Sequence, residues 1–219
     1  MREALPGPAG GARFSSCGGG VAAEHPAIEV FSDFACPFCY LAEPGLKRLE
    51  ADGATVRYRS FELRPAPSPL APPGDDPQKR AGWEQIIAPW AARLGLAMRF
   101  PEFAVRTRKA HEAARFAALN GAGRAMRDAI YAAYFAEGLD IGRIDVLVGI
   151  GAGVGLDRTA LKVSLDIDQQ TEAVTADRAE AMALRLTAVP AFIGRGMQPA
   201  RLIGLRDYEA LRTWVETGS

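Results

Sequence analysis

The residues with the clearest chemical potential are two cysteines, Cys36 and Cys39, separated by Pro37 and Phe38. Cysteines at this spacing either exchange electrons with a disulfide or ligate a metal. In the redox reaction only a thiolate attacks, so one sulfur must lie where its anion is stabilised. The second thiol then displaces the first from the mixed disulfide. The pair predicts thiol–disulfide exchange, with Cys36 as nucleophile and Cys39 as resolving thiol.

A strand and a helix must position this pair. Residues Ala27–Ser32 alternate in polarity and are rich in β-formers, which predicts a strand. Pro37 suits the first turn of a helix that we expect to end near Asp52–Gly53. Unpaired peptide N–H groups at a helix start favour an anion. We therefore expect an exposed Cys36 sulfur at the helix start and a more buried Cys39 one turn further on.

Zinc binding is the main alternative function of such a cysteine pair. A structural zinc site needs four ligands, commonly two cysteine pairs or one pair with histidines. The chain has one further cysteine, Cys17, and two histidines, His25 and His111. Cys17 lies in residues 1–26, whose Gly, Pro, Ala and Ser content predicts a flexible tail with a free thiol. We therefore expect no metal site.

The middle of the chain reads as a helical block. A second strand is predicted at Thr55–Phe61, and the dense proline of Pro65–Pro77 is typical of a stiff connector. Beyond the connector the apolar residues recur with a helical period. The predicted helices are Pro77–Leu94, Thr107–Asn120, Gly123–Glu137, Arg143–Gly153 and Asp168–Arg185, with shorter pieces between them.

Two late strands and a helix complete the pattern. Strand signals return at Pro190–Ile193 and Arg201–Ile203, with a turn expected around Gly194–Gly196. A last helix is predicted at Arg206–Glu216. The order of elements is typical of an α/β thioredoxin fold with an inserted all-helical domain.

This order divides the chain into parts. We expect the thioredoxin-fold domain to consist of residues 27–64 and 187–219, with the helical insertion at 65–186. Thioredoxin folds place a cis-proline against the cysteine pair, at the strand that follows the insertion. A cis X-Pro bond turns the preceding backbone outward, where an extended substrate can pair with it. Val189 and Pro190 are therefore the predicted substrate-binding residues.

Composition narrows the function classes. Acidic and basic residues are equal in number, so no net field favours nucleic acid or an anionic membrane. The weakly polar run Val146–Leu156 is too short and too Gly-rich to span a bilayer. The N-terminus lacks the apolar stretch of a secretory signal, and three cysteines do not suit a disulfide-stapled secreted domain. We expect a cytoplasmic protein.

With these residues in view, the chain resembles the DsbA family, and its FrnE-like branch most closely. The resemblance implies a thioredoxin fold with a helical insertion, disulfide oxidoreductase activity and no cofactor beyond the redox-active disulfide. It also implies that Cys36 is the nucleophile, Cys39 the resolving thiol and Pro190 the cis-proline. The matching stretches are Phe31–Leu41, Phe61–Pro65, Ala110–His111, Ala133–Gly138, Asp140–Gly142, Val146–Val148 and Val189–Phe192.

The chain departs from these relatives in two ways. Several FrnE-like proteins carry a further cysteine pair, whereas no cysteine follows Cys39 here. DsbA has Pro-His between its cysteines, and the Pro37-Phe38 spacer leaves the oxidising power and the direction of electron flow open. The substrate is expected to be a protein or small thiol or disulfide, and glutathione stays open as the reductant. The redox partner and the oligomeric state also stay open, a homodimer included.

Two other functions share this fold branch or its groove. Kappa-class glutathione transferases and hydroxychromene-carboxylate isomerases resemble the chain in layout but place a serine at the position of Cys36. A glutathione-dependent transferase or isomerase is therefore the alternative function. A third possible function is that of a redox-inert module that binds extended peptides beside Pro190.

Three further features favour structural interpretations. We interpret Asp33 as a turn residue in preference to a proton relay or a group that tunes the thiol. His111 is interpreted as a packed or solvent-facing histidine in preference to a catalytic one. The glycines of Gly149–Gly155 do not match a nucleotide-binding spacing, and we expect them to end a helix.

Overall fold

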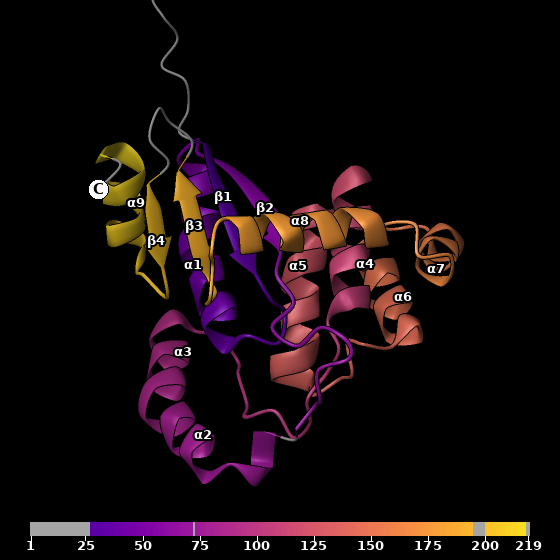
Figure 1. Cartoon of the computed structure of the whole chain (residues 1–219), viewed down its shortest axis with the longest axis horizontal. Helices are drawn as coiled ribbons and strands as arrows, with labels where there is room; N and C mark the ends of the chain where they lie inside the picture. The colour runs from indigo at the N-terminus through magenta and orange to yellow at the C-terminus, as the bar shows by residue number, and fades with distance from the viewer. Residues whose placement is uncertain (1–26, 72, 195–199, 218–219) are drawn as a thin grey trace, which may run out of the picture.

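The computed structural model describes residues 27–71, 73–194 and 200–217. A mixed sheet lies on one side of the molecule and most of the helical block on the other (Figure 1). The predicted tail, with Cys17 and His25, lies outside the described residues. So do residues 195 and 196 of the predicted turn. None of the helices that the structure describes is long and apolar enough to cross a membrane.

Within the part of the chain that the structure describes, the sheet has four strands in the order β2-β1-β3-β4. Strand β1 (Ala27–Ser32) pairs parallel with β2 (Thr55–Ser60) and antiparallel with β3 (Ala191–Gly194). Strand β4 (Arg201–Ile203) pairs antiparallel with β3 at the edge. The strand predictions are thus confirmed to within a residue at each end. The central place of β1 explains why five of its six residues are buried.

The register brings the end of β1 close to the start of β3. Ser32 is opposite Ser60 on β2, and Phe31 is opposite Ala191 on β3. The residues that follow β1 therefore lie beside the residues that precede Ala191. This pairing places Cys36 near Val189 and Pro190, which lie more than 150 residues further along the chain.

One face of the sheet is covered by helices α1 (Pro37–Ala51) and α9 (Tyr208–Thr217). Alternate residues of β1 turn to this face, as the two-residue period of a strand requires. They pack with apolar side chains of β3, α1 and α9, each of which contributes about 1.5–3 kcal/mol when fully buried. The buried cluster consists of Ile28, Val30, Ala42, Leu46, Leu49, Phe192, Leu211 and Trp214.

The helical block lies between β2 and β3 in the chain. The predicted Pro77–Leu94 helix is a continuous helical run with a π-helical turn in its middle, and Figure 1 shows it apart from the rest of the helical block. A π-helical turn also ends the predicted Gly123–Glu137 helix. The elements are η1 (Pro73–Asp75), α2 (Pro77–Gly82), η2 (Trp83–Ile87), α3 (Ala88–Leu94), α4 (Arg108–Leu119), α5 (Gly123–Ala132), η3 (Ala133–Glu137), α6 (Ile144–Gly153), α7 (Arg158–Asp166) and α8 (Thr171–Ala183).

The glycine run ends a helix, as interpreted from its sequence. Helix α6 stops at Gly153, and Gly155 follows with a φ of 85°. A side chain at Gly151 would collide with Leu161 of α7, so this glycine permits close packing of the two helices. Helix α7 lies between the predicted Arg143–Gly153 and Asp168–Arg185 helices, where the sequence predicted shorter pieces without bounds.

Candidate active site

Cys36 is the residue at which α1 begins. Its backbone is extended, with φ −93° and ψ 114°, and its carbonyl accepts hydrogen bonds from the N–H groups of Cys39 and Tyr40. Pro37 follows as the first helical residue, a position whose N–H has no helical partner in any case. The nucleophilic candidate thus lies at the positive end of the helix, where a thiolate is stabilised.

The expectation of an exposed Cys36 was wrong. The residue is only 5% exposed, and Cys39 is 1% exposed. The Cys36 thiol donates a hydrogen bond to the carbonyl oxygen of Val189 at 3.5 Å, and the Val189–Pro190 bond is cis. The segment between α8 and β3 therefore covers the sulfur. The sequence could not show this, because the covering residues come from the far end of the chain.

Cys39 is held as a neutral thiol. Burial is the main cause that raises its pKa well above the ordinary value, and a hydrogen bond with the Cys36 side chain and the charge of Cys36 raise it further. Both cysteines are free. Within the described residues, no group of three or more His, Cys, Asp or Glu side chains could hold a metal ion.

Asp33 does more than form a turn. Its side chain is buried, and its oxygens accept hydrogen bonds from the N–H of Ala35 at 2.9 Å and of Leu63 at 2.5 Å. The Thr107 side chain adds a third. Burial outweighs these bonds and raises the pKa of Asp33 to about 6. The carboxyl thus ties the loop after β1 to the loop after β2, directly before the cysteine pair.

His111 is packed and not solvent-facing. It is 3% exposed, and its ring centroid lies 5.0 Å from that of Phe34, which precedes the cysteine pair. Burial, with the charges of Arg127 and Arg108, lowers its pKa to about 3. The imidazole is therefore neutral at physiological pH.

A family model decides where this chain belongs. The model, described as a DSBA-like thioredoxin domain, matches residues 27–215. The chain belongs to the DsbA-like thioredoxin family. It is also 35% identical to an uncharacterized protein of Bacillus subtilis, YwbO, over 173 residues that make up 76% of this chain and 85% of YwbO.

Solved structures repeat the DsbA-like fold. The structure of a probable DsbA oxidoreductase, SCO1869 from Streptomyces coelicolor, covers 87% of this chain and 88% of its own, with a TM-score of 0.77 and 28% identity. A 2-hydroxychromene-2-carboxylate isomerase shares the fold with a TM-score of 0.70 and 21% identity. The match covers 88% of this chain and 94% of the isomerase. The cytosolic disulfide reductase DsbM from Pseudomonas aeruginosa also shares the fold, with a TM-score of 0.67 and 22% identity. The match covers 88% of this chain and 98% of DsbM.

The DsbA-like site includes residues that the sequence did not single out as functional. The hydroxyl of Tyr131 donates to the carbonyl of Asp33 at 3.4 Å, and its ring stacks on Tyr40 at 5.1 Å. Tyr131 lies on α5 and is fully buried. Its burial beneath the cysteine pair required the tertiary structure. Thr107, from the loop before α4, was likewise missed.

The buried Asp33 of this DsbA-like protein predicts a pH dependence of stability. An acid whose pKa is raised from 3.8 to about 6 on folding stabilises the protein fully below pH 3.8, and loses that contribution as the pH rises toward 6. The loss corresponds to about 3 kcal/mol. From about pH 4 to about pH 7, the free energy of unfolding of Asp33→Asn should rise by most of this amount relative to that of the unmodified protein.

Urea unfolding of both proteins at a series of pH values provides the measurement. Subtracting the two curves removes the titration of His111 and other groups, which is common to both proteins. A difference that stays constant from about pH 4 to pH 7 would show that Asp33 does not titrate in this range.

Proposed function

We propose that this protein is a disulfide oxidoreductase. It works by thiol–disulfide exchange between a substrate and the cysteine pair Cys36 and Cys39. The observation that carries the proposal is the placement of Cys36 at the start of α1, with the thiol of Cys39 hydrogen-bonded to it. A helix start stabilises the attacking thiolate. Membership of the DsbA-like family supports this use of the pair.

The proposed reaction moves two electrons in two exchanges. The thiolate of Cys36 attacks one sulfur of a substrate disulfide, a Cys36–substrate bond forms, and the first substrate thiol leaves with a proton. Cys39 then attacks the sulfur of Cys36 and releases the second substrate thiol. The protein ends with a Cys36–Cys39 disulfide and the substrate is reduced. The reverse sequence oxidises a substrate dithiol.

The second exchange needs a base, because Cys39 is a poor acid in its buried position. Asp33 is buried beside it, and its backbone hydrogen-bonds the Cys39 side chain. With a pKa of about 6, its carboxyl is charged at neutral pH. These features support the proposal that Asp33 takes up the proton as Cys39 attacks.

We assign substrate binding to Val189 and Pro190. The Val189 carbonyl accepts the hydrogen bond of the Cys36 thiol at 3.5 Å, so this backbone segment already faces the reacting sulfur. An extended substrate bound along it would present its disulfide to Cys36.

The proposal needs no cofactor, and a thiol such as glutathione would restore the reduced pair. The cytoplasm, a reducing compartment, suits this cycle. DsbM, which has the same fold, is described as a cytosolic disulfide reductase, and this supports a cytoplasmic location.

Insulin reduction in the presence of a thiol reductant tests the proposal. The unmodified protein should accelerate the reaction, and Cys36→Ser should abolish the acceleration, because a hydroxyl does not attack a disulfide. Full activity in Cys36→Ser would overturn the mechanism. The alternative, a glutathione-dependent transferase or isomerase, predicts instead that Cys36→Ser retains conjugating or isomerising activity with glutathione.

A further inference from the structure

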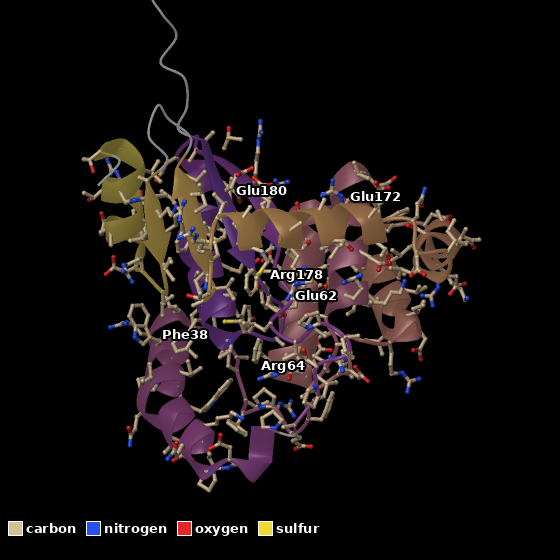
Figure 2. The ribbon with its side chains drawn as sticks, in the orientation of Figure 1. Phe38, Glu62, Arg64, Glu172, Arg178 and Glu180 are labelled. Carbon is tan, nitrogen blue, oxygen red and sulfur yellow. The ribbon has the colours of Figure 1, made fainter. Side chains whose placement is uncertain are left out.

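A cleft of about 270 Å³ opens beside the start of α1. Ala35 and Pro37, the two chain neighbours of Cys36, line it together with Phe38. In Figure 2 Phe38 lies beside α3, whereas Arg64 lies on the other side, near the α5–η3 helix. Both residues line the cleft, so its walls come from α1, the α2–α3 run and the connector after β2.

The wall contributed by the α2–α3 run and the following loop is apolar. The rings of Trp83 and Phe100 meet edge to face, with centroids 5.6 Å apart. Ile86 lines the same wall and is 48% exposed, so its apolar side chain is accessible to a ligand. With Phe38 opposite, this surface suits a flat aromatic or a branched group.

The charges on the cleft are positive. None of the described residues that line it is acidic, and two, Arg64 and Lys79, are basic. Lys79 is paired with Asp76 at 3.2 Å. Arg64 forms no ion pair with a carboxylate of the described residues, and its charge is felt at the hydroxyl of Tyr134, another lining residue. The half-buried Arg64 thus leaves a guanidinium available to an anion.

The dimensions favour a small ligand over a folded protein. A cleft of about 270 Å³ is at the lower end of small-molecule sites, which are typically about 300 Å³ or more. Cys36 is only 5% exposed, so a bulky protein surface would reach its sulfur with difficulty. Ala35 and Pro37, which flank Cys36 in the chain, line the cleft, so a compact disulfide bound there lies beside the segment that carries the reacting sulfur.

We propose that this cleft receives one half of a small disulfide that carries an aromatic ring and a carboxylate. The ring packs against Ile86 and Trp83, and the carboxylate pairs with Arg64. This proposal rests on the proposed function and names its substrate class. The reaction is balanced by the protein itself: two cysteine thiols and one small disulfide give the Cys36–Cys39 disulfide and two small thiols.

Four disulfides separate the two features of the proposed ligand. Dithiobis(nitrobenzoate) is aromatic and acidic, dithiodipyridine is aromatic and uncharged, dithiodipropionate is aliphatic and acidic, and cystamine is aliphatic and basic. Each is mixed with reduced protein in a Cys17→Ser background. Formation of the protein disulfide is followed by acid quenching and mass spectrometry. Variant and unmodified rates are compared for the same disulfide, so that intrinsic reactivity cancels.

Two variants probe the cleft. Arg64→Gln should slow the two acidic disulfides about fivefold, leave dithiodipyridine unchanged and accelerate cystamine, because only the charge has been altered. Ile86→Ser should slow the two aromatic disulfides about fivefold to tenfold and the aliphatic ones less, since it removes apolar contact. The matched controls are Arg57→Gln, on the exposed face of β2, and Ile167→Ser, at the end of α7. Both controls should leave all four rates unchanged.

The outcomes separate this proposal from the proposed function. If Arg64→Gln and Ile86→Ser change all four rates equally, or none, the cleft does not select the ligand and the inference is overturned while exchange at Cys36 stands. If they slow insulin reduction and leave the four small disulfides unaffected, a peptide occupies the cleft and the inference is again overturned. If Cys36→Ser consumes the four disulfides and releases their thiols as fast as the unmodified protein, the proposed function itself fails.

Discussion

Replacing Cys39 with Ser should leave a protein that attacks disulfides and then cannot free itself. Cys36 would form the mixed disulfide, and no neighbouring thiol would resolve it. Because an intramolecular thiol acts at an effective concentration far above that of any external thiol, turnover should fall by at least about a hundredfold. Mass spectrometry under non-reducing conditions should show one equivalent of substrate thiol bound to Cys36.

Cys36→Ser is the matched control for this trapping experiment. Cys39 is 1% exposed, and its raised pKa keeps it protonated, so it should form no adduct in that variant. Equal trapping by the two variants would show that the thiols are interchangeable and would contradict the assignment of roles. Turnover by Cys39→Ser at the unmodified rate would contradict it as well.

Replacing Glu43 with Ala should destabilise the protein by about 3–5 kcal/mol. Glu43 lies on α1 with its side chain 2% exposed, and it accepts a hydrogen bond at 2.6 Å from Arg127, whose side chain is 6% exposed. Arg127 also donates to Ser32 at 3.1 Å, and its guanidinium lies 3.8 Å from the ring of Tyr58. Removing the carboxylate leaves a buried cation without its counter-charge, which raises the free energy of the folded state.

Glu209→Ala is the control for this prediction. Glu209 also faces an arginine, Arg48, at 3.8 Å, but both side chains are largely exposed, so its loss should cost less than about 1 kcal/mol. Urea unfolding gives both values. Adding Arg127→Met to Glu43→Ala should recover part of the loss, because the buried charge is then removed. Equal destabilisation by Glu43→Ala and Glu209→Ala would show that burial of the pair contributes nothing.

Local patterns were enough to predict most elements of the fold. The alternating Ala27–Ser32 segment, Pro37 at the helix start and the return of strand signals near Pro190 each carry a short-range signal, and each element formed as expected. Helix α7 was given no bounds because its nine residues are fewer than the roughly 11 over which a helical period can be recognised. Its start is instead marked by Asp157, whose side chain accepts a hydrogen bond from the N–H of Ala160 at 2.7 Å.

The site was less predictable because its environment is built from distant segments. The spacing of Cys36 and Cys39 identifies the pair, but the cover over Cys36 comes from Val189. The sequence alone indicates a turn residue at Asp33. Its burial depends on Leu63 and Thr107, from two other loops, which hydrogen-bond to its carboxyl. Arg64, which forms no ion pair with a carboxylate of the described residues, likewise has no distinguishing sequence signal. Burial and ion pairing depend on the tertiary fold, which a residue pattern does not contain.

Peptide mapping after one turnover tests the central claim most directly. Fully reduced protein is mixed with one equivalent of a small disulfide, quenched with acid, digested and examined by mass spectrometry. The proposed mechanism predicts that Cys36 and Cys39 become linked, that two equivalents of substrate thiol are released, and that a thiol reductant reverses the link. Consumption of the disulfide without a Cys36–Cys39 link, or with Cys17 as the modified residue, would contradict it.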